Sequence, residues 1–130
     1  MASIFSKIVS GEIPCHRIAE TADYLAFLDV MPLAVGHTLV IPKREINYIF
    51  DVEDEELAGL IVFAKKIARA IEASVPCARI GLSVIGLEVP HAHVHLVPIR
   101  SVGDLNFSKP KMTVTAEELA ATAAAIRAKI

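Results

Sequence analysis

The sequence predicts an α+β fold, a five-stranded antiparallel sheet with a long helix on one face, a short N-terminal helix and a C-terminal helix. Short strand-like segments follow one another without helical crossovers, which favours antiparallel pairing. One central stretch repeats its apolar residues with the period of a helix laid on a sheet, and a capped alanine-rich stretch ends the chain. With 130 residues, we expect one domain, residues 1–130.

Composition is that of an ordinary globular protein. Hydrophobic residues make up 54%, charged residues 22%, and the formal net charge is −2. A clustered basic excess is absent from the sequence, so no nucleic-acid partner is predicted. The first seven residues lack the apolar run of a secretion signal, and no stretch has the length of a membrane span, so a cytoplasmic protein without a membrane partner is expected. Cys15 and Cys77 are predicted to be free thiols.

The N-terminal quarter predicts one helix and two strands. Residues 3–10 place Ile4, Phe5 and Ile8 one turn apart before Gly11, which predicts a short helix packed through those side chains. Strands are predicted at 16–20 and 24–30, the second ended by Met31 and Pro32.

Asp29 shares a face of the second predicted strand with Leu25 and Phe27. The residue types leave two interpretations open: a solvated acid at the end of a strand, or a carboxylate that accepts hydrogen bonds from a ligand's hydroxyls.

Gly36 opens a third predicted strand, 37–41, which Pro42 closes. His37 aligns with Leu39 and Ile41 on the apolar side, where a histidine is more often structural than catalytic.

The central helix is predicted to begin near Asp51 and Asp54 and to end before Pro76. Its expected apolar face consists of Leu57, Leu60, Ile61, Ala64, Ile67, Ala68 and Ile71.

A fourth strand is predicted at 80–85, with Ser83 inside it, and a polar loop at 99–112. Thr115 and Glu118 form a capping box for the last helix, whose apolar seam is Leu119, Ala123, Ile126 and Ile130. A five-stranded sheet has two open edges, so a homodimer is expected.

Residues 90–98 form the fifth predicted strand and contain three candidate functional histidines. His91, His93 and His95 alternate there with Ala92, Val94 and Leu96, so the three imidazoles share one face. Side chains two residues apart on a strand are separated by roughly 6.5 to 7 Å. This spacing suits a metal site completed by a further ligand, or a nucleophilic imidazole with two neighbours that position it. The third interpretation is an exposed His-rich strand without a function.

The stretch Gly86–Val97 resembles the His-x-His-x-His segment of the histidine triad family. The resemblance extends over residues 1–98 through four further stretches, 3–8, 11–14, 27–30 and 36–43, and residues 99–130 match no pattern of the family.

The resemblance implies a protein that binds nucleotides and cleaves at the α-phosphate of phosphoramidates, dinucleoside polyphosphates or acyl-nucleotides. It implies that His93 is the nucleophile, that His91 and His95 flank the phosphate, that His37 supports them, and that Asp29 binds the ribose hydroxyls. The implied base pocket consists of Ile4, Phe5, Ile8, Phe27, Leu28 and Val30.

Departures from the family's pattern concern the phosphate side of this implied site. Leu87 and Glu88 stand where relatives commonly have Gln and then Ser or Thr, and Ser83 stands near a common Asn. Glu88 beside a phosphate is unfavourable unless it is protonated, points away, or donates a proton to the leaving group, and the last role is our hypothesis. Ser3 and Ser6 replace a zinc-binding cysteine pair of some relatives, so neither metal nor cofactor is expected.

The leading prediction is therefore a nucleotide hydrolase or nucleotidyl transferase that acts through a covalent nucleotidyl-His93 intermediate. The second hypothesis is a nucleotide-binding regulatory protein in which the Leu87–Glu88 pair has removed turnover. The third is a metal-binding histidine strand, which leaves Phe27, Asp29 and His37 unexplained.

Overall fold

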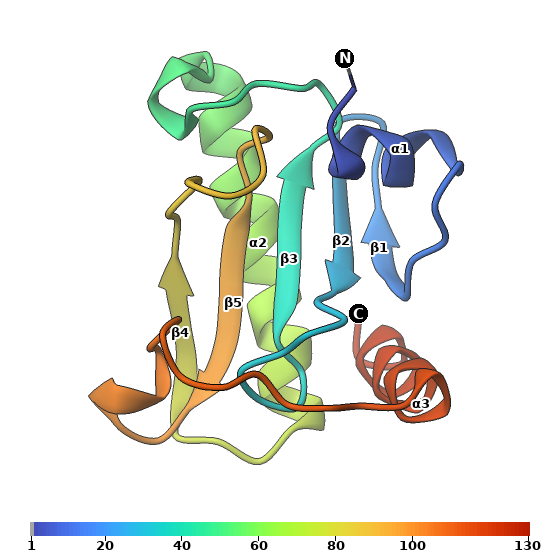
Figure 1. Ribbon diagram of the computed structural model, residues 1–130, viewed down its shortest axis with the longest axis vertical. Helices are drawn as coiled ribbons and strands as arrows, with labels where there is room; N and C mark the ends of the chain where they lie inside the picture. Colours follow the sequence, from blue (N-terminus) through green and yellow to red (C-terminus); the bar gives the residue numbers. More distant parts are fainter. Residues whose placement is uncertain (1) are drawn as a thin grey trace.

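The computed structural model describes residues 2–130 and has the predicted fold class, a five-stranded antiparallel sheet with strand order β1-β2-β3-β5-β4 (Figure 1). The strands are β1 (Arg17–Glu20), β2 (Tyr24–Leu28), β3 (Thr38–Pro42), β4 (Arg79–Ser83) and β5 (Val94–Ile99). The α-helices are α1 (Ile4–Ser10), α2 (Asp54–Ser74) and α3 (Ala116–Arg127), and the short 3₁₀ turns are η1 (Ile49–Asp51) and η2 (Val102–Asp104).

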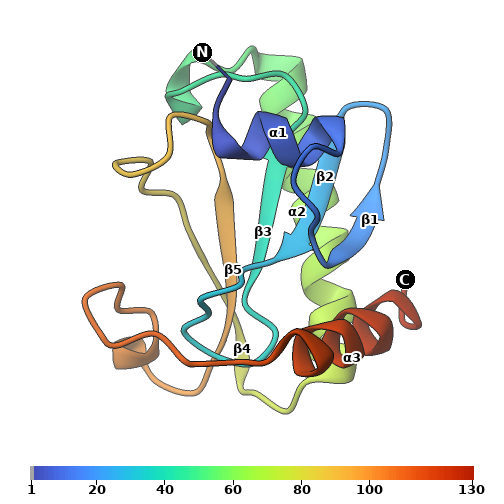
Figure 2. The same ribbon diagram turned by 45° about the vertical axis from the view of Figure 1, so that its right-hand side comes forward.

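Each face of the sheet buries its own hydrophobic cluster. The alternation in β2 separates them, because Leu25 and Phe27 pack toward α1, whereas Ala26 and Leu28 pack toward α2 and α3. Figure 2 shows α1 lying across one face and α2 behind the other. The α1 side is therefore thinly covered, and this is the side on which a binding site can open.

Helix α2 begins later than predicted. Its N-cap is Glu53, and Asp51 instead ends the turn η1. Phe63 is buried although its position was not predicted to be, because its ring stacks on Tyr24 with centroids 5.7 Å apart. Ile61, expected on the buried face, is 41% exposed. The remaining buried positions of α2 are Leu60, Ala64, Ile67, Ala70 and Ile71.

The C-terminal segment crosses the foot of the sheet from the β4 side to α3, which packs beside β1 (Figure 1). The amide of Met112 donates to the Pro32 carbonyl at 2.9 Å, which ties the crossing to the loop after β2. The predicted capping box forms, with Thr115 accepting from the Glu118 amide at 3.1 Å. Ile130 lies beyond α3 and is half exposed, so it does not extend the apolar seam.

The histidine segment is shorter as a strand than predicted, since regular pairing begins only at Val94. The amide of Ala92 donates to the Ile46 carbonyl at 2.6 Å, so this residue is held by the connector after β3 and not by a strand. His91 through Leu96 are nonetheless all buried. The interpretation as an exposed His-rich strand is therefore wrong.

The predicted second strand also ends early, at Leu28, because the Asp29 side chain turns the chain by accepting from the Met31 amide at 2.9 Å. Strands β1 and β4 form the open edges of the sheet, and the expected homodimer stays a prediction. Cys15 and Cys77 are free, as predicted. No helix within residues 2–130 has the length and apolar character needed to cross a bilayer.

Candidate active site

Four histidines meet on the α1 side of the sheet. His95 pairs with Leu39 of β3 on one side and with Ser83 of β4 on the other, and residues directly opposite in antiparallel strands share a face. His37 precedes β3 and lies on that same face, with its ring centroid 5.3 Å from that of His95. The fold therefore joins His37 to the triad. Its strand pattern alone favoured a structural histidine, whereas the family resemblance implied that it supports the triad.

His93 has one ring nitrogen fixed, and within residues 2–130 the other has no hydrogen-bond partner. Its Nδ1 donates to the carbonyl oxygen of His91 at 2.7 Å. A carbonyl can only accept, so the proton of the neutral ring resides on Nδ1, and Nε2 keeps its lone pair. The ring packs edge to face against Phe5 at 4.9 Å and against His95 at 4.8 Å. These contacts orient a nucleophilic nitrogen.

The tautomers of His37 and His95 follow from one backbone amide. Leu33 donates to His37 Nδ1 at 3.0 Å, so that nitrogen is unprotonated and the ring proton lies on Nε2. Nε2 of His37 then donates to Nδ1 of His95, also at 3.0 Å. The remaining proton of neutral His95 must lie on its Nε2, which is left as a hydrogen-bond donor beside His93.

Burial keeps this pair neutral. Desolvation, with a smaller contribution from the nearby Lys111, lowers the pKa of His37 to about 4. Desolvation, followed by the nearby His93, His37 and Lys111, lowers the pKa of His95 to about 3. Both rings are therefore uncharged at neutral pH, which agrees with the donor and acceptor roles deduced from the hydrogen bonds.

His91 has both ring nitrogens engaged within the protein. Nε2 donates to the Pro42 carbonyl at 2.8 Å, and Nδ1 accepts from the Ser3 hydroxyl at 3.0 Å. Burial also lowers the pKa of His91. No nitrogen remains for a phosphate, in contrast to the expectation that His91 flanks it. His91 instead positions His93, through the carbonyl that accepts from His93 Nδ1.

Ser3, Ser6 and Glu45 bind the start of α1 to His91. Ser3 Oγ accepts from the Ser6 amide at 3.0 Å as the helix N-cap, while Glu45 accepts from the Ser3 amide and from the Ser6 hydroxyl, both at 2.6 Å. The Ser6 hydroxyl, the stronger cause, and the Ser3 amide lower the pKa of Glu45 to about 2. Sequence reasoning missed Glu45, which is 42 residues from Ser3 and sits in a connector.

This cluster does not fit the zinc site that the resemblance associates with a cysteine pair. Two neutral hydroxyls replace two thiolates, and each donates its proton to a neighbouring acceptor, Ser3 to His91 and Ser6 to Glu45. Zinc sites are built from deprotonated sulfur, imidazole and carboxylate ligands. The hydrogen bonds therefore take up the groups that a metal would need.

Asp29, His37 and His95 form a second cluster whose ligand atoms lie within 4.8 Å of one another. Asp29 Oδ2 is 3.6 Å from His37 Nε2, farther than His95 Nδ1 at 3.0 Å. A histidine that binds a metal through Nε2 needs its proton on Nδ1, and there the Leu33 amide already donates. A metal-binding role is thus disfavoured.

Burial raises the pKa of the Asp29 carboxyl, although the hydrogen bond from the Met31 amide and the nearby Lys111 charge act to lower it.

The residues of the implied base pocket separate into two groups. Phe5 and Phe27 are buried together, with ring centroids 5.6 Å apart, and Phe5 also contacts the His93 ring. Ile8 packs against the hydrophobic cluster that contains both phenylalanines. Leu28 faces the opposite side of the sheet, in the core under α2 and α3, so it is not placed to line the same pocket. Ile4 and Val30 are each at least half exposed and leave room for a ligand to cover them.

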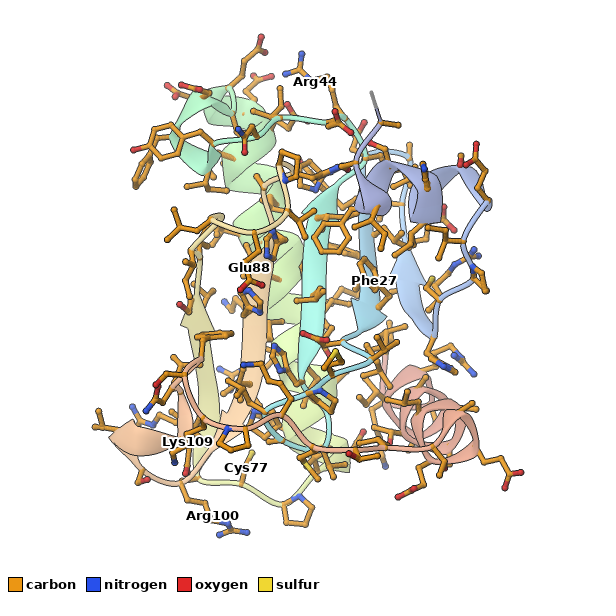
Figure 3. The ribbon with its side chains drawn as sticks, in the orientation of Figure 1. Phe27, Arg44, Cys77, Glu88, Arg100 and Lys109 are labelled. Atoms are coloured by element: carbon orange, nitrogen blue, oxygen red, sulfur yellow. The ribbon has the colours of Figure 1, made fainter. Side chains whose placement is uncertain are left out.

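Ser83 and Glu88 differ in how firmly the fold places them. Ser83 ends β4 opposite His95, on the same face. Glu88 is exposed in the loop before β5 and lies over the start of that strand in Figure 3. Leu87 is 89% exposed and has no packing role.

Phe107 and Lys111 reach the histidines from the segment that the sequence left unassigned. The Phe107 ring lies 4.6 Å from the His95 ring and 6.2 Å from the His37 ring. Lys111 Nζ lies 5.6 Å from the centre of the Phe107 ring. No pattern in the sequence gave a signal for these contacts, because they depend on how the polar loop folds back.

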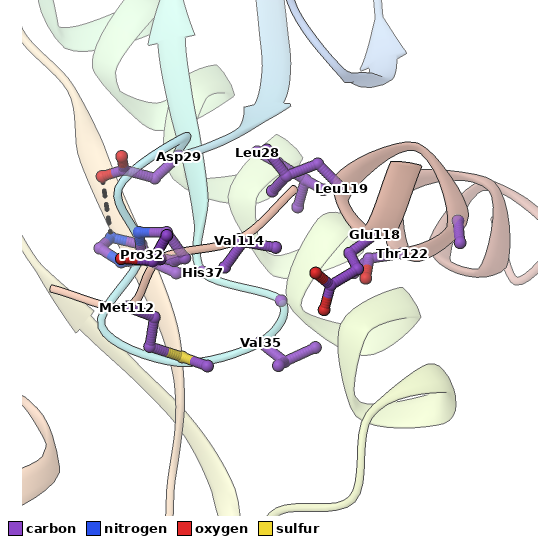
Figure 4. Close-up of a pocket in the computed structure, with 13 residues that line it drawn as sticks. Leu28, Asp29, Pro32, Val35, His37, Met112, Val114, Glu118, Leu119 and Thr122 are labelled. Atoms are coloured by element: carbon purple, nitrogen blue, oxygen red, sulfur yellow. Dashed lines mark ion pairs between the residues drawn. The ribbon is translucent and has the colours of Figure 1, made fainter. Parts of the chain in front are cut away.

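A pocket of about 290 Å³ lies behind Asp29 and His37, and Figure 4 shows those two side chains at one end of it and Glu118 and Thr122 at the other. Neither His93 nor His95 lines it. This pocket is therefore separate from Nε2 of His93, which lies on the α1 side of the sheet.

Comparison with known proteins agrees with this geometry. The family model described as the HIT domain matches residues 10–102. The adenosine 5′-monophosphoramidase hnt1 of Schizosaccharomyces pombe is 36% identical over 132 residues, which cover 100% of this chain and 99% of that protein.

Two solved structures share the fold. A Hit-like protein from Bartonella henselae superposes with a TM-score of 0.85 at 32% identity, covering 98% of this chain and 96% of that one. A zinc-bound histidine triad family protein from Mycobacterium smegmatis gives a TM-score of 0.81 at 31% identity, covering 99% and 93%. Both superpositions also cover most of the C-terminal segment that follows residue 102. With its triad, its sheet and this match over residues 10–102, the chain belongs to the histidine triad family.

Proposed function

We propose that this protein is a nucleotide hydrolase or nucleotidyl transferase that cleaves at the α-phosphate of a nucleoside phosphoramidate or a (di)nucleoside polyphosphate. The observation that supports it most is the hydrogen bond from His93 Nδ1 to the His91 carbonyl, which leaves Nε2 as a free nucleophile. The full-length likeness to an adenosine 5′-monophosphoramidase favours an adenosine phosphoramidate among these substrates.

In the first step, the lone pair of His93 Nε2 forms a bond to the α-phosphorus, and the leaving group departs with the electron pair of the broken bond and takes up a proton. In the second, water attacks phosphorus and releases a proton to solvent, the P–Nε2 bond returns its electrons to the ring, and a nucleoside monophosphate leaves. The cationic ring of the intermediate is stabilised because Nδ1–H already points at a carbonyl oxygen.

The other groups have separate roles in this scheme. His95 donates from Nε2 to an equatorial phosphate oxygen, because its Nδ1 is occupied by His37. Asp29 accepts from the ribose hydroxyls, and Phe5 and Phe27 form the apolar floor under the base. Ser83, opposite His95, adds a hydroxyl near the phosphate.

A nucleotide-binding regulatory protein without turnover remains the second candidate, since Leu87 and Glu88 offer no amide or hydroxyl side chain to the phosphate. Such a protein would bind a nucleoside monophosphate and release no product from any phosphoramidate. The homodimer and the cytoplasmic location remain expectations of the same proposal.

The His93→Ala variant tests the nucleophile. We expect its kcat/KM with adenosine phosphoramidate to fall at least roughly 10³-fold, because the covalent route is lost. Wild-type protein quenched in acid during turnover of labelled substrate should yield an acid-labile nucleotidyl adduct by mass spectrometry, and His93→Ala should yield none. Thr113→Ala, an exposed residue of the C-terminal segment, is the control. An adduct at another residue would contradict the assignment.

Neutral His37 and His95 make the stability depend on pH. The unfolded chain binds protons on both rings below about pH 6.5, whereas the folded protein resists doing so until about pH 4 for His37 and 3 for His95. The free energy of unfolding should therefore fall as the pH is lowered from about 6.5 to 4, by about 1.4 kcal/mol for each unit of pKa shift.

Urea unfolding at a series of pH values measures this effect. Replacing both rings, in a His37→Asn and His95→Asn double variant, should flatten the dependence in this range. A wild-type stability that is constant or rises on acidification would contradict the neutral pair.

Glu88→Gln tests the proposed proton donor. If Glu88 protonates the leaving group, the variant should lose roughly 10²-fold or more in kcat with a poor amine leaving group, and the pH dependence of kcat should change. A substrate whose leaving group needs no proton should be affected much less. Glu12→Gln, an exposed glutamate on another loop, is the matched control. An unchanged rate and pH profile would eliminate the role.

A further inference from the structure

The segment 105–112, which we call the covering segment, brings Phe107 against the rings of His37 and His95. Phe107 contacts the His95 ring edge to face, at 4.6 Å and 63°. The Met112 amide is bonded to the Pro32 carbonyl, so the segment is fixed at its far end to the loop that follows Asp29. Residues between these two anchors are therefore held between His95 and the loop that follows Asp29.

Lys111 is the cation of this segment that turns inward. Its side chain is partly buried, Nζ donates to the Phe107 carbonyl at 2.8 Å, and the ammonium lies 5.6 Å from the centre of the Phe107 ring. Within residues 2–130, no carboxylate lies close enough to form an ion pair with Lys111. An ammonium has three donors, so donors remain for a ligand. By contrast, Lys109 is exposed (Figure 3).

Lys111 brings a positive charge to the histidine site. His37 and His95 are neutral, and the Lys111 charge acts on both rings and on Asp29, lowering the pKa of each. A phosphate that enters beside His95 is anionic, and positioning and neutralising its oxygens is the main task of a site for phosphoryl or nucleotidyl transfer.

We propose that Lys111 is a phosphate-contacting residue, whose ammonium binds a non-bridging oxygen of the nucleotide's phosphate beside His95. The inference rests on the proposed function, because it requires a nucleotide in the site. The competing explanation is that Lys111 only balances the partly buried carboxylate of Asp29. The two differ in one respect: a phosphate contact acts on the charged ligand alone.

Affinities for AMP and for adenosine separate these explanations. Calorimetry would measure both ligands with the wild-type protein, Lys111→Met, Lys111→Arg and the matched control Lys109→Met. We expect Lys111→Met to weaken AMP binding about tenfold or more and to leave adenosine binding unchanged, because a charged hydrogen bond to phosphate is lost. Lys111→Arg should restore part of the AMP affinity, and Lys109→Met should resemble the wild type.

An equal loss for both ligands in Lys111→Met, whether from unfolding or from a changed Asp29, would overturn the inference, and so would no loss at all. In both cases the wild-type protein would still prefer AMP to adenosine, and the proposed function would stand. A wild-type protein that binds neither ligand would overturn the inference and the proposed function together.

Discussion

The hydrogen bond between His93 Nδ1 and the carbonyl of His91 is the interaction on which the site depends. It joins a side chain to the backbone two residues earlier, so it forms only when that backbone has the right direction. The Ala92 amide, bonded to the connector at Ile46, and the His91 ring, bonded to Pro42, hold this direction. The departure from regular strand geometry before Val94 therefore allows this hydrogen bond, which orients Nε2 of His93.

Two further sets of contacts extend this constraint across the protein. Helix α1 is bound to His91 through Ser3, and the β2–β3 loop fixes the tautomer of His95 through the Leu33 amide and His37. Hydrogen bonds to backbone groups, to Ser3 and between the rings thus assign the proton position of His37, His91, His93 and His95. Segments from the N-terminus to residue 111 converge on the histidines, where the His37 and His95 rings are neutral and the Lys111 ammonium supplies a positive charge.

The sequence predicted the fold class, the order of the elements and the shared face of the histidines, because these depend on local periodicity and on a family motif. It could not predict the roles of Glu45, Phe107 or Lys111, whose contacts join residues far apart in the chain. The alternation in 24–30 did separate Phe27 from Leu28, yet the family resemblance assigned both to one pocket. The structure places them on opposite faces.

Nitrogen NMR of the histidine rings tests the central claim most directly, because it reports which nitrogen of each ring bears the proton. The account predicts that the neutral form of His93 is protonated on Nδ1 alone, while at neutral pH His37 and His95 are protonated on Nε2 alone. A His93 ring protonated on Nε2, or exchanging freely between its two neutral forms, would contradict the claim that the backbone of His91 aims the nucleophile.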